Sequence, residues 1–245
     1  MSPSLHLVHM RPKLNRMLPW AQRQGLVPDK GQGDLGYAFH AALRAALGDL
    51  APQPFSYREG QGLLAYSTQG DALKAAAALA PPEVADMLGL DESPQSPGLL
   101  VRPFPVIWKQ GQLLAFEVRA RPIVRAKDGR ERDAFLSAIE RSPDGQHTRE
   151  AVYADWLKRQ FAQAAQLHEV GMTAFLLSAV LRRGAIQAEG GRSKRPVLGP
   201  DAVFAGVLQI QDAQAFADLL ARGIGRHRAF GFGMLLLKPA AAVWV

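Results

Sequence analysis

The chain has 245 residues, of which 48% are hydrophobic and 21% charged, which is typical of a globular protein with one large or two small domains. It has no cysteine, which excludes disulfides, thiolate metal ligands and cysteine nucleophiles and favours a cytoplasmic protein. No apolar run reaches the roughly 18–20 residues of a membrane span, so no membrane association is expected. A net charge of +7 favours a polyanionic partner, with nucleic acid as the leading candidate.

The positive charge is concentrated in three segments, at residues 119–132, 182–195 and 221–228. Clusters of this kind attract phosphate groups. A solvated basic surface would give the same pattern of charge, so charge alone leaves both interpretations open.

The first half of the chain contains alternating strand and helix patterns. Its predicted elements, in order, are a strand at 5–10, a helix at 34–47 with Asp34 as N-cap, a hairpin at 55–68 that turns near residues 60–62, a helix at 71–80, a surface insertion at 81–97 and a proline-interrupted edge strand at 98–107.

The second half follows a similar order. Its predicted elements are a strand at 112–122, a polar loop at 123–148, a helix at 149–166, strands at 173–188 and 201–210 joined by a basic hairpin tip, a helix at 212–222 and a last strand at 231–238. The helix at 149–166 should direct four side chains toward the core: Val152, Trp156, Leu157 and Phe161.

Each half therefore has the order β-α-β-β-α-β, which predicts an α+β protein built from tandem ferredoxin-like domains. A faint similarity between the strand-Asp-Ala-helix segments of the two halves favours duplication. We expect one domain at 1–110 and the other at 111–245. The first contains the helix at 34–47, and the second contains the basic hairpin and a glycine-rich loop.

The helix at 34–47 has two distinct faces. At about 100° per residue, five apolar residues fall on one side, where we expect the core: Leu35, Phe39, Ala42, Leu43 and Ala46. Tyr37, His40 and Arg44 fall together on the opposite side and should face solvent. A phenol, an imidazole and a guanidinium on one stripe make a candidate catalytic site, although three unrelated surface residues would give the same spacing.

The other histidines do not form a recognisable metal motif. They are His6, His9, His147, His168 and His227, and none has HxxxH or H-x-x-E-H spacing. Serine-hydrolase and phosphate-binding P-loop motifs are also missing from the sequence. We therefore expect neither a metal nor another cofactor.

The segment GIGRHRAFGFGMLLL, residues 223–237, has four glycines that bracket three basic residues. The glycines are Gly223, Gly225, Gly231 and Gly233, and between them stand Arg226, His227 and Arg228. Turn and bulge geometry explains individual glycines. Backbone without Cβ can also approach phosphate closely, so the loop favours a groove for nucleic-acid backbone.

The basic hairpin tip is a candidate second arm for nucleic acid. Its cations are Arg182, Arg183, Arg192, Lys194 and Arg195. Double-stranded RNA is recognised largely by its shape and backbone charge, which suits a pair of basic arms.

Three motifs together resemble the CasE family of CRISPR repeat-processing endoribonucleases of type I-E systems. The loop at 223–237 is similar to the family's C-terminal glycine-rich signature. FEVRARP at 116–122, with Arg119 and Arg121, is similar to its R-x-R-A-x-P strand, and Tyr37 and His40 match its Tyr-x-x-His helix. Residues 11–33 and Gly36 depart from the family pattern.

The resemblance implies tandem ferredoxin-like domains and a metal-independent enzyme that cuts at the 3′ base of a CRISPR repeat stem-loop. It implies His40 as general acid or base, Tyr37 and Arg44 as supporting residues, and membership of a multi-protein CRISPR effector complex. One alternative is a type IV-like relative that uses arginines for cleavage. Others are a non-catalytic RNA-binding subunit of an effector complex and a protein that binds duplex DNA.

Overall fold

The computed structural model describes residues 5–26, 35–93, 96–105, 107–126, 129–186 and 192–240. The side chains of residues 181–196 and the predicted N-cap Asp34 lie outside the described part of the chain. No helix within these ranges is both long and apolar enough to cross a membrane.

The first half folds around a four-stranded antiparallel sheet with the strand order β2-β3-β1-β6. Its strands are β1 (Leu5–Met10), β2 (Phe55–Arg58), β3 (Gly62–Ser67) and β6 (Leu100–Phe104). Its helices are α1 (Leu14–Arg23), α2 (Leu35–Leu47), α3 (Gly70–Ala78) and α4 (Pro82–Leu88), with a short 3-10 helix, η1 (Gly48–Leu50), after α2. Strand β6 lies at the sheet edge, as its prolines predicted.

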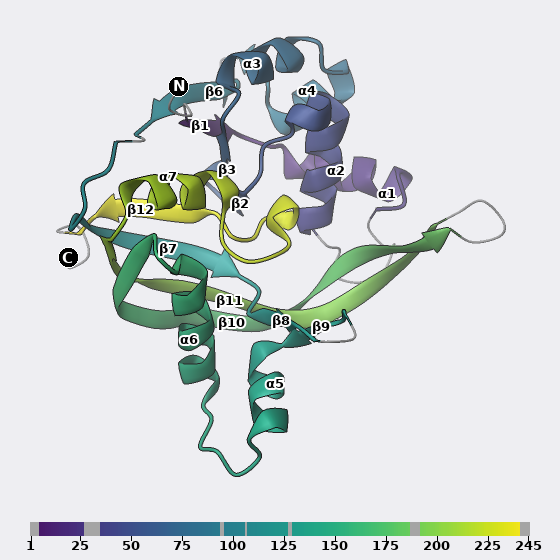
Figure 1. The fold of residues 1–245 in the computed structure, drawn as a ribbon. Coiled ribbons are helices and arrows are strands. Elements are labelled where there is room, and N and C mark those ends of the chain that lie inside the picture. The colour runs from purple at the N-terminus through teal and green to yellow at the C-terminus, as the bar shows by residue number, and fades with distance from the viewer. Residues whose placement is uncertain are drawn as a thin grey trace.

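The second half has an equivalent sheet with the order β10-β11-β7-β12. Its strands are β7 (Leu113–Ala120), β10 (Ala165–Ile186), β11 (Arg192–Ile210) and β12 (Leu235–Pro239). Its helices are α5 (Ala134–Arg141), α6 (Arg149–Phe161) and α7 (Ala213–Arg222), with a 3-10 helix, η2 (Arg228–Phe230), in the glycine-rich loop. Figure 1 shows β10 and β11 as a long hairpin that extends well beyond the sheet.

In both sheets the first strand lies between the third and the fourth, which is the ferredoxin-like arrangement. The predicted tandem ferredoxin-like fold is therefore confirmed. We propose that the boundary between the two domains lies near residue 110, between the end of β6 and the start of β7.

Local sequence explains where helix α7 begins and ends. The Asp212 carboxylate accepts a hydrogen bond from the Ala215 backbone N–H at 2.8 Å, which is N-cap geometry. Gly223 ends the helix, and its N–H donates to the Leu219 carbonyl at 2.7 Å. Both ends agree with the helix predicted at 212–222.

The two halves are joined by polar contacts as well as by packing. The buried Tyr66 hydroxyl on β3 donates a hydrogen bond to the Leu235 carbonyl on β12 at 2.9 Å. Burial raises the pKa of Tyr66 above its usual value, so the phenol remains a donor at neutral pH. Arg58 on β2 also forms an ion pair with Glu117 on β7.

The prediction of a surface insertion at 81–97 is wrong for its first half. Residues 82–88 form helix α4, which begins at a proline and ends at Gly89 with φ +66°. Its apolar face is in the core, with four buried side chains: Val84, Ala85, Met87 and Leu88. Four prolines in the segment indicated a loop, although proline at the first turn of a helix is well tolerated.

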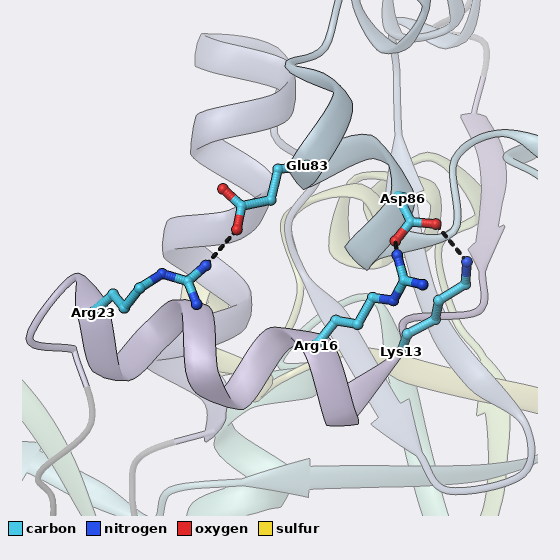
Figure 2. A network of polar contacts seen from close by, with 5 residues as sticks. All are labelled: Lys13, Arg16, Arg23, Glu83 and Asp86. Carbon is cyan, nitrogen blue, oxygen red and sulfur yellow. Dashed lines mark hydrogen bonds and ion pairs between the residues drawn. The ribbon is translucent and has the colours of Figure 1, made fainter.

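Helix α4 also anchors helix α1 through two groups of ion pairs, which Figure 2 shows. Lys13 and Arg16 both bind Asp86, and Arg23 binds Glu83. The hydrogen bond from Lys13 holds the pKa of the Asp86 carboxyl below its usual value.

The predicted polar loop at 123–148 is also wrong, because it contains β8 (Ile123–Arg125), β9 (Glu131–Asp133) and helix α5. Asp133 caps α5 through the Phe135 N–H at 2.8 Å and accepts hydrogen bonds from the Tyr153 hydroxyl at 2.8 and 2.9 Å. The Arg149 guanidinium lies 3.1 Å from the same carboxylate. The sequence of this segment looks like a loop because it is rich in charged residues. In the structure Asp133 pairs with Arg149 and Tyr153, which allows these residues to lie in regular elements.

Helix α6 ends at Phe161, and β10 begins four residues later, so the predicted helix at 149–166 was too long. Of its predicted core residues, Trp156, Leu157 and Phe161 are buried and Val152 is partly buried. Trp156 also donates from its indole N–H to the Ile123 carbonyl at 3.0 Å, which ties α6 to β8.

Candidate active site and nucleic-acid interface

The prediction of a solvent-facing stripe on helix α2 is wrong for Tyr37, while His40 is partly exposed and Arg44 is exposed. Phe39, Ala42, Leu43 and Ala46 are buried in the core as expected. Tyr37 on the opposite face is only 4% exposed. It is buried because the glycine-rich loop of the second half packs over it.

Phe230 is the residue that makes this cover. Its ring stacks on Tyr37 with a centroid separation of 5.8 Å and an interplanar angle of 16°. The same ring meets His40 edge-on at 5.1 Å, while Tyr37 and His40 are 6.4 Å apart. The Tyr-x-x-His pair is therefore fixed by an aromatic contact from a residue about 190 positions later in the chain.

A cavity of about 660 Å³ opens beside this aromatic cluster. It is lined by parts of α2, η1, the segment leading to β2, and the glycine-rich loop. The lining brings together His40, Tyr37, Arg44 and His227. His40 is partly exposed, so its imidazole is accessible to a bound molecule.

Arg44 lies at the edge of the cavity and donates to the Asp49 carboxylate at 2.7 Å. The Asp49 side chain is 96% exposed, so the pair is screened by solvent and is weak. A phosphate that enters the cavity can therefore compete with Asp49 for Arg44 at small cost.

All four glycines of the loop have positive φ: Gly223, Gly225, Gly231 and Gly233. Each also touches the protein closely. A Cβ on Gly223 would lie 2.7 Å from Pro54 Cγ, one on Gly225 3.0 Å from Trp156, and one on Gly231 3.2 Å from Phe55. These contacts give the glycines a role in the fold, and a contact between their backbone and RNA stays a prediction.

Gly233 is the most restricted of the four, because a Cβ there would stand 2.2 Å from the Ile224 carbonyl oxygen. Its carbonyl accepts from the Ile224 N–H at 2.8 Å, and its N–H donates to the Arg119 carbonyl at 2.7 Å. The first bond closes the loop, and the second fixes it to β7.

We expect Gly233→Ala to lower the melting temperature much more than Gly60→Ala. Gly60 has nearly the same φ, +77° against +78°, but nothing lies within 4 Å of its Cβ position. Both variants incur the backbone strain of roughly 1–3 kcal/mol, and only Gly233→Ala adds a clash with backbone. Calorimetry measures both melting temperatures. If the two variants melt at the same temperature, the clash at Gly233 is relieved and glycine is needed there only for its positive φ.

The Arg-His-Arg side chains of the loop form hydrogen bonds and ion pairs with other groups of the protein. Arg226 Nε donates to Glu131 Oε1 at 2.7 Å, and His227 Nε2 lies 2.9 Å from Glu131 Oε2. Arg228 donates to the Arg222 carbonyl at 2.7 Å. Burial, with the nearby cations Arg222 and Arg226, lowers the pKa of Arg228.

Arg119 and Arg121 of the predicted R-x-R-A-x-P motif differ in burial, because Arg119 is exposed and Arg121 is buried. Arg119 forms a bidentate pair with the buried Asp201, with its Nε 2.8 Å from Oδ1, and its guanidinium lies 4.7 Å from the centre of the Phe232 ring. Arg121 is 3% exposed and donates to the Ser178 carbonyl at 3.1 Å. Both arginines join the glycine-rich loop to the base of the hairpin, and their contact with RNA stays a prediction.

The basic hairpin residues lie on the paired ends of β10 and β11. Arg182 is opposite Arg195, and Arg183 is opposite Lys194. Arg192 is opposite Ile186. The side chains of the five cations lie outside the described part of the chain, so their predicted role in RNA binding stays a prediction.

Within the described ranges no cluster of three or more His, Asp or Glu side chains is close enough to hold a metal ion. The sequence did not reveal Phe230, Glu131, Asp49 or Asp201 as parts of this region. Phe230 had a visible signal, because it is one of the two phenylalanines inside the glycine-rich loop. Glu131, Asp49 and Asp201 belong to no sequence motif, so nothing in the sequence identified them as part of the site.

The structure thus defines a tandem ferredoxin-like protein in which a Tyr-His helix of one half meets a glycine-rich loop of the other at a cavity. The profile of the family described as "CRISPR associated protein" matches residues 6–239. The chain therefore belongs to this CRISPR-associated family.

A curated relative supports the more specific resemblance. The chain is similar to the CRISPR system Cascade subunit CasE of Escherichia coli strain K12, with 31% identity over 129 residues. That alignment covers 53% of this chain and 59% of the relative. The resemblance to CasE that the three motifs indicated is thereby confirmed.

Two solved structures share the fold over nearly the whole chain. One is CRISPR endoribonuclease Cse3 bound to 19 nt RNA, which has a TM-score of 0.62 at 19% identity, over 98% of this chain and all of that one. The other is Thermus thermophilus Cse3 bound to an RNA representing a pre-cleavage complex, with a TM-score of 0.60 at 18% identity over 96% of this chain and all of that one. At this identity the likeness shows the fold.

Proposed function

We propose that the protein is an endoribonuclease that processes CRISPR repeat RNA. The observation that carries the proposal is the meeting of Tyr37 and His40 with the glycine-rich loop at one cavity, in a chain of a CRISPR-associated family. The relatives support it by their names. Cse3 is described as a CRISPR endoribonuclease bound to RNA, and CasE is described as a subunit of the CRISPR system Cascade.

The proposed reaction needs no group outside the protein and the RNA. The ribose 2′-oxygen attacks the adjacent phosphorus, its proton passes to a base, and the 5′-oxygen leaves with a proton from an acid. The products are a 2′,3′-cyclic phosphate and a 5′-hydroxyl. His40 is the proposed general acid or base, and general acid–base catalysis suits an imidazole at neutral pH.

Tyr37 and Arg44 have supporting roles in this proposal. Tyr37 lines the cavity next to His40 and is fixed by Phe230, so its phenol can hold the 2′-hydroxyl or the imidazole in one place. Arg44 stabilises the charge that develops on the phosphorane once the phosphate has displaced Asp49.

The proposed partner is the stem-loop of a CRISPR repeat, with the cut at its 3′ base. The β10–β11 hairpin projects beyond the second sheet and carries five cations, which suits a duplex read by its backbone. We further propose that the protein is a subunit of a multi-protein CRISPR effector complex, as the name of the CasE relative suggests.

The arginine-based alternative is less well supported by the structure. Its candidate cations in residues 11–33 are Arg11, Lys13, Arg16 and Arg23. Three of them bind acids of α4 and hold helix α1 in place (Figure 2). Arg11 and Arg44 are the remaining candidates for such a mechanism.

Cleavage in EDTA tests the enzymatic proposal. The protein should cut the repeat RNA found beside its gene at the same rate in EDTA and in magnesium, because the proposed acid, base and charge stabiliser are side chains. Loss of cleavage in EDTA that magnesium restores would refute metal independence. A protein that binds the hairpin tightly without cutting it would be a non-catalytic RNA-binding subunit. A protein that prefers a DNA duplex to the RNA hairpin in competition would be a duplex-DNA-binding protein.

A further inference from the structure

The glycine-rich loop depends on one carboxylate from a distant part of the chain. Glu131 lies on β9, about 95 residues before the loop, and its side chain is only 7% exposed. One of its oxygens accepts from Arg226, and the other faces the His227 ring. His227 is itself held at φ +61°, in the left-handed region that non-glycine residues rarely adopt.

The loop segment that Glu131 binds leads directly into η2. The Phe230 N–H donates to the His227 carbonyl at 2.8 Å, so the position of His227 sets the start of this turn. His227 and Phe230 also lie close, with ring centroids 6.1 Å apart. Phe230 then stacks on Tyr37 and meets the edge of His40.

Strand β9 is a firm base for this contact. Asp133, two residues after Glu131 on the same strand, binds Tyr153 and Arg149 of α6 and caps α5. The Arg149 guanidinium also lies over the rings of Phe135 and Phe175, at 4.4 and 4.7 Å. A carboxylate on such a rigid element can fix a loop more precisely than another loop could.

We propose that Glu131 is a positioning residue for RNA cleavage. It holds the start of η2 through Arg226 and His227, and η2 holds Phe230 against the catalytic helix. This inference rests on the proposed function, in which His40 acts on the RNA. Loss of the carboxylate should leave the cavity in place but let the aromatic cover move relative to the imidazole.

Glu131→Ala should slow single-turnover cleavage of the repeat RNA at saturating protein by about 10²-fold, as expected for a misplacement of about 1 Å. Its affinity for the uncleaved hairpin should stay close to that of Glu140→Ala. Glu140 is a matched control, because it is an exposed glutamate of α5 that pairs with Arg132, and its loss changes the charge by the same amount.

His227→Gly tests the same contact from the loop side, and glycine suits the backbone at φ +61°. It should slow cleavage to a similar extent, and it serves as the test if Glu131→Ala does not fold. The double variant should be no slower than the slower single variant, since the contact between Glu131 and His227 is already lost in each single variant.

The outcomes separate this inference from the proposed function. A folded Glu131→Ala that cleaves at the wild-type rate, while His40→Ala does not cleave, would overturn the positioning role alone. So would additive losses in the double variant, or an affinity that falls as far as the rate, because the loop would then bind RNA directly. A His40→Ala protein with full activity would instead refute the proposed function.

Discussion

His40→Ala should slow single-turnover cleavage of the repeat hairpin by about 10²–10⁴-fold, the usual contribution of general acid–base catalysis. Its affinity for the hairpin should stay nearly unchanged, because the imidazole lines the cavity, whereas the cations proposed to bind the stem lie on the β10–β11 hairpin. The measurement is a time course at saturating protein, combined with a binding titration.

Two further variants make the His40 result specific. Tyr37→Phe should cost less, because the remaining ring still stacks on Phe230. His168→Ala is the control. His168 is an exposed histidine on β10 that lies outside the cavity and forms a hydrogen bond with Gln209. An unimpaired His40→Ala protein would contradict the proposed role and would favour catalysis by Arg44 or Arg11.

Replacement of Arg192, Lys194 and Arg195 by alanine should flatten the salt dependence of hairpin binding. Each phosphate contact releases condensed counterions, with a log-log slope of about −0.9 per contact for a DNA duplex, so the slope should change by up to about three units. Hairpin affinity should drop, while the cleavage rate at saturating protein stays near normal.

A triple variant of equal charge provides the control for the hairpin. Lys74 on α3, Lys109 between β6 and β7, and Lys158 on α6 are exposed cations, and their joint replacement by alanine removes the same three charges. Only the hairpin variant should change the slope. If wild type and both variants give parallel slopes, the hairpin tip does not touch phosphate and is a solvated basic surface.

The ferredoxin-like order could be predicted because strands and helices alternate with clear turn signals between them. The ends of α7 are an example, since Asp212 and Gly223 mark them in the sequence and cap them in the structure. Elements whose polar residues bind one another were missed. Helix α5 and strand β9 lie in a segment that looks like loop because it is rich in charged residues, but Asp133 of β9 pairs with Arg149 of α6 in a partly buried network.

The candidate site was predicted in part. Helical periodicity grouped Tyr37 with His40, and both line the cavity, but Tyr37 is buried in the core of the first half and does not face solvent. Periodicity could not show that Phe230 covers Tyr37, because a periodic pattern within one helix contains no information about a distant loop. The glycines of the loop were interpreted as turn and bulge positions that also leave room for RNA backbone. Pro54, Phe55 and Trp156 lie beside the Cβ positions of three of them, and contact with RNA stays a prediction.

Cleavage of a repeat RNA with a single 2′-deoxynucleotide on the 5′ side of the cut tests the proposed reaction most directly. The 2′-oxygen is the proposed nucleophile, so its removal should abolish cleavage at that phosphate while the hairpin still binds with normal affinity. The all-ribose RNA should yield a 2′,3′-cyclic phosphate and a 5′-hydroxyl in EDTA. Normal cleavage of the deoxy-substituted RNA, or a 5′-phosphate product, would contradict the proposed mechanism.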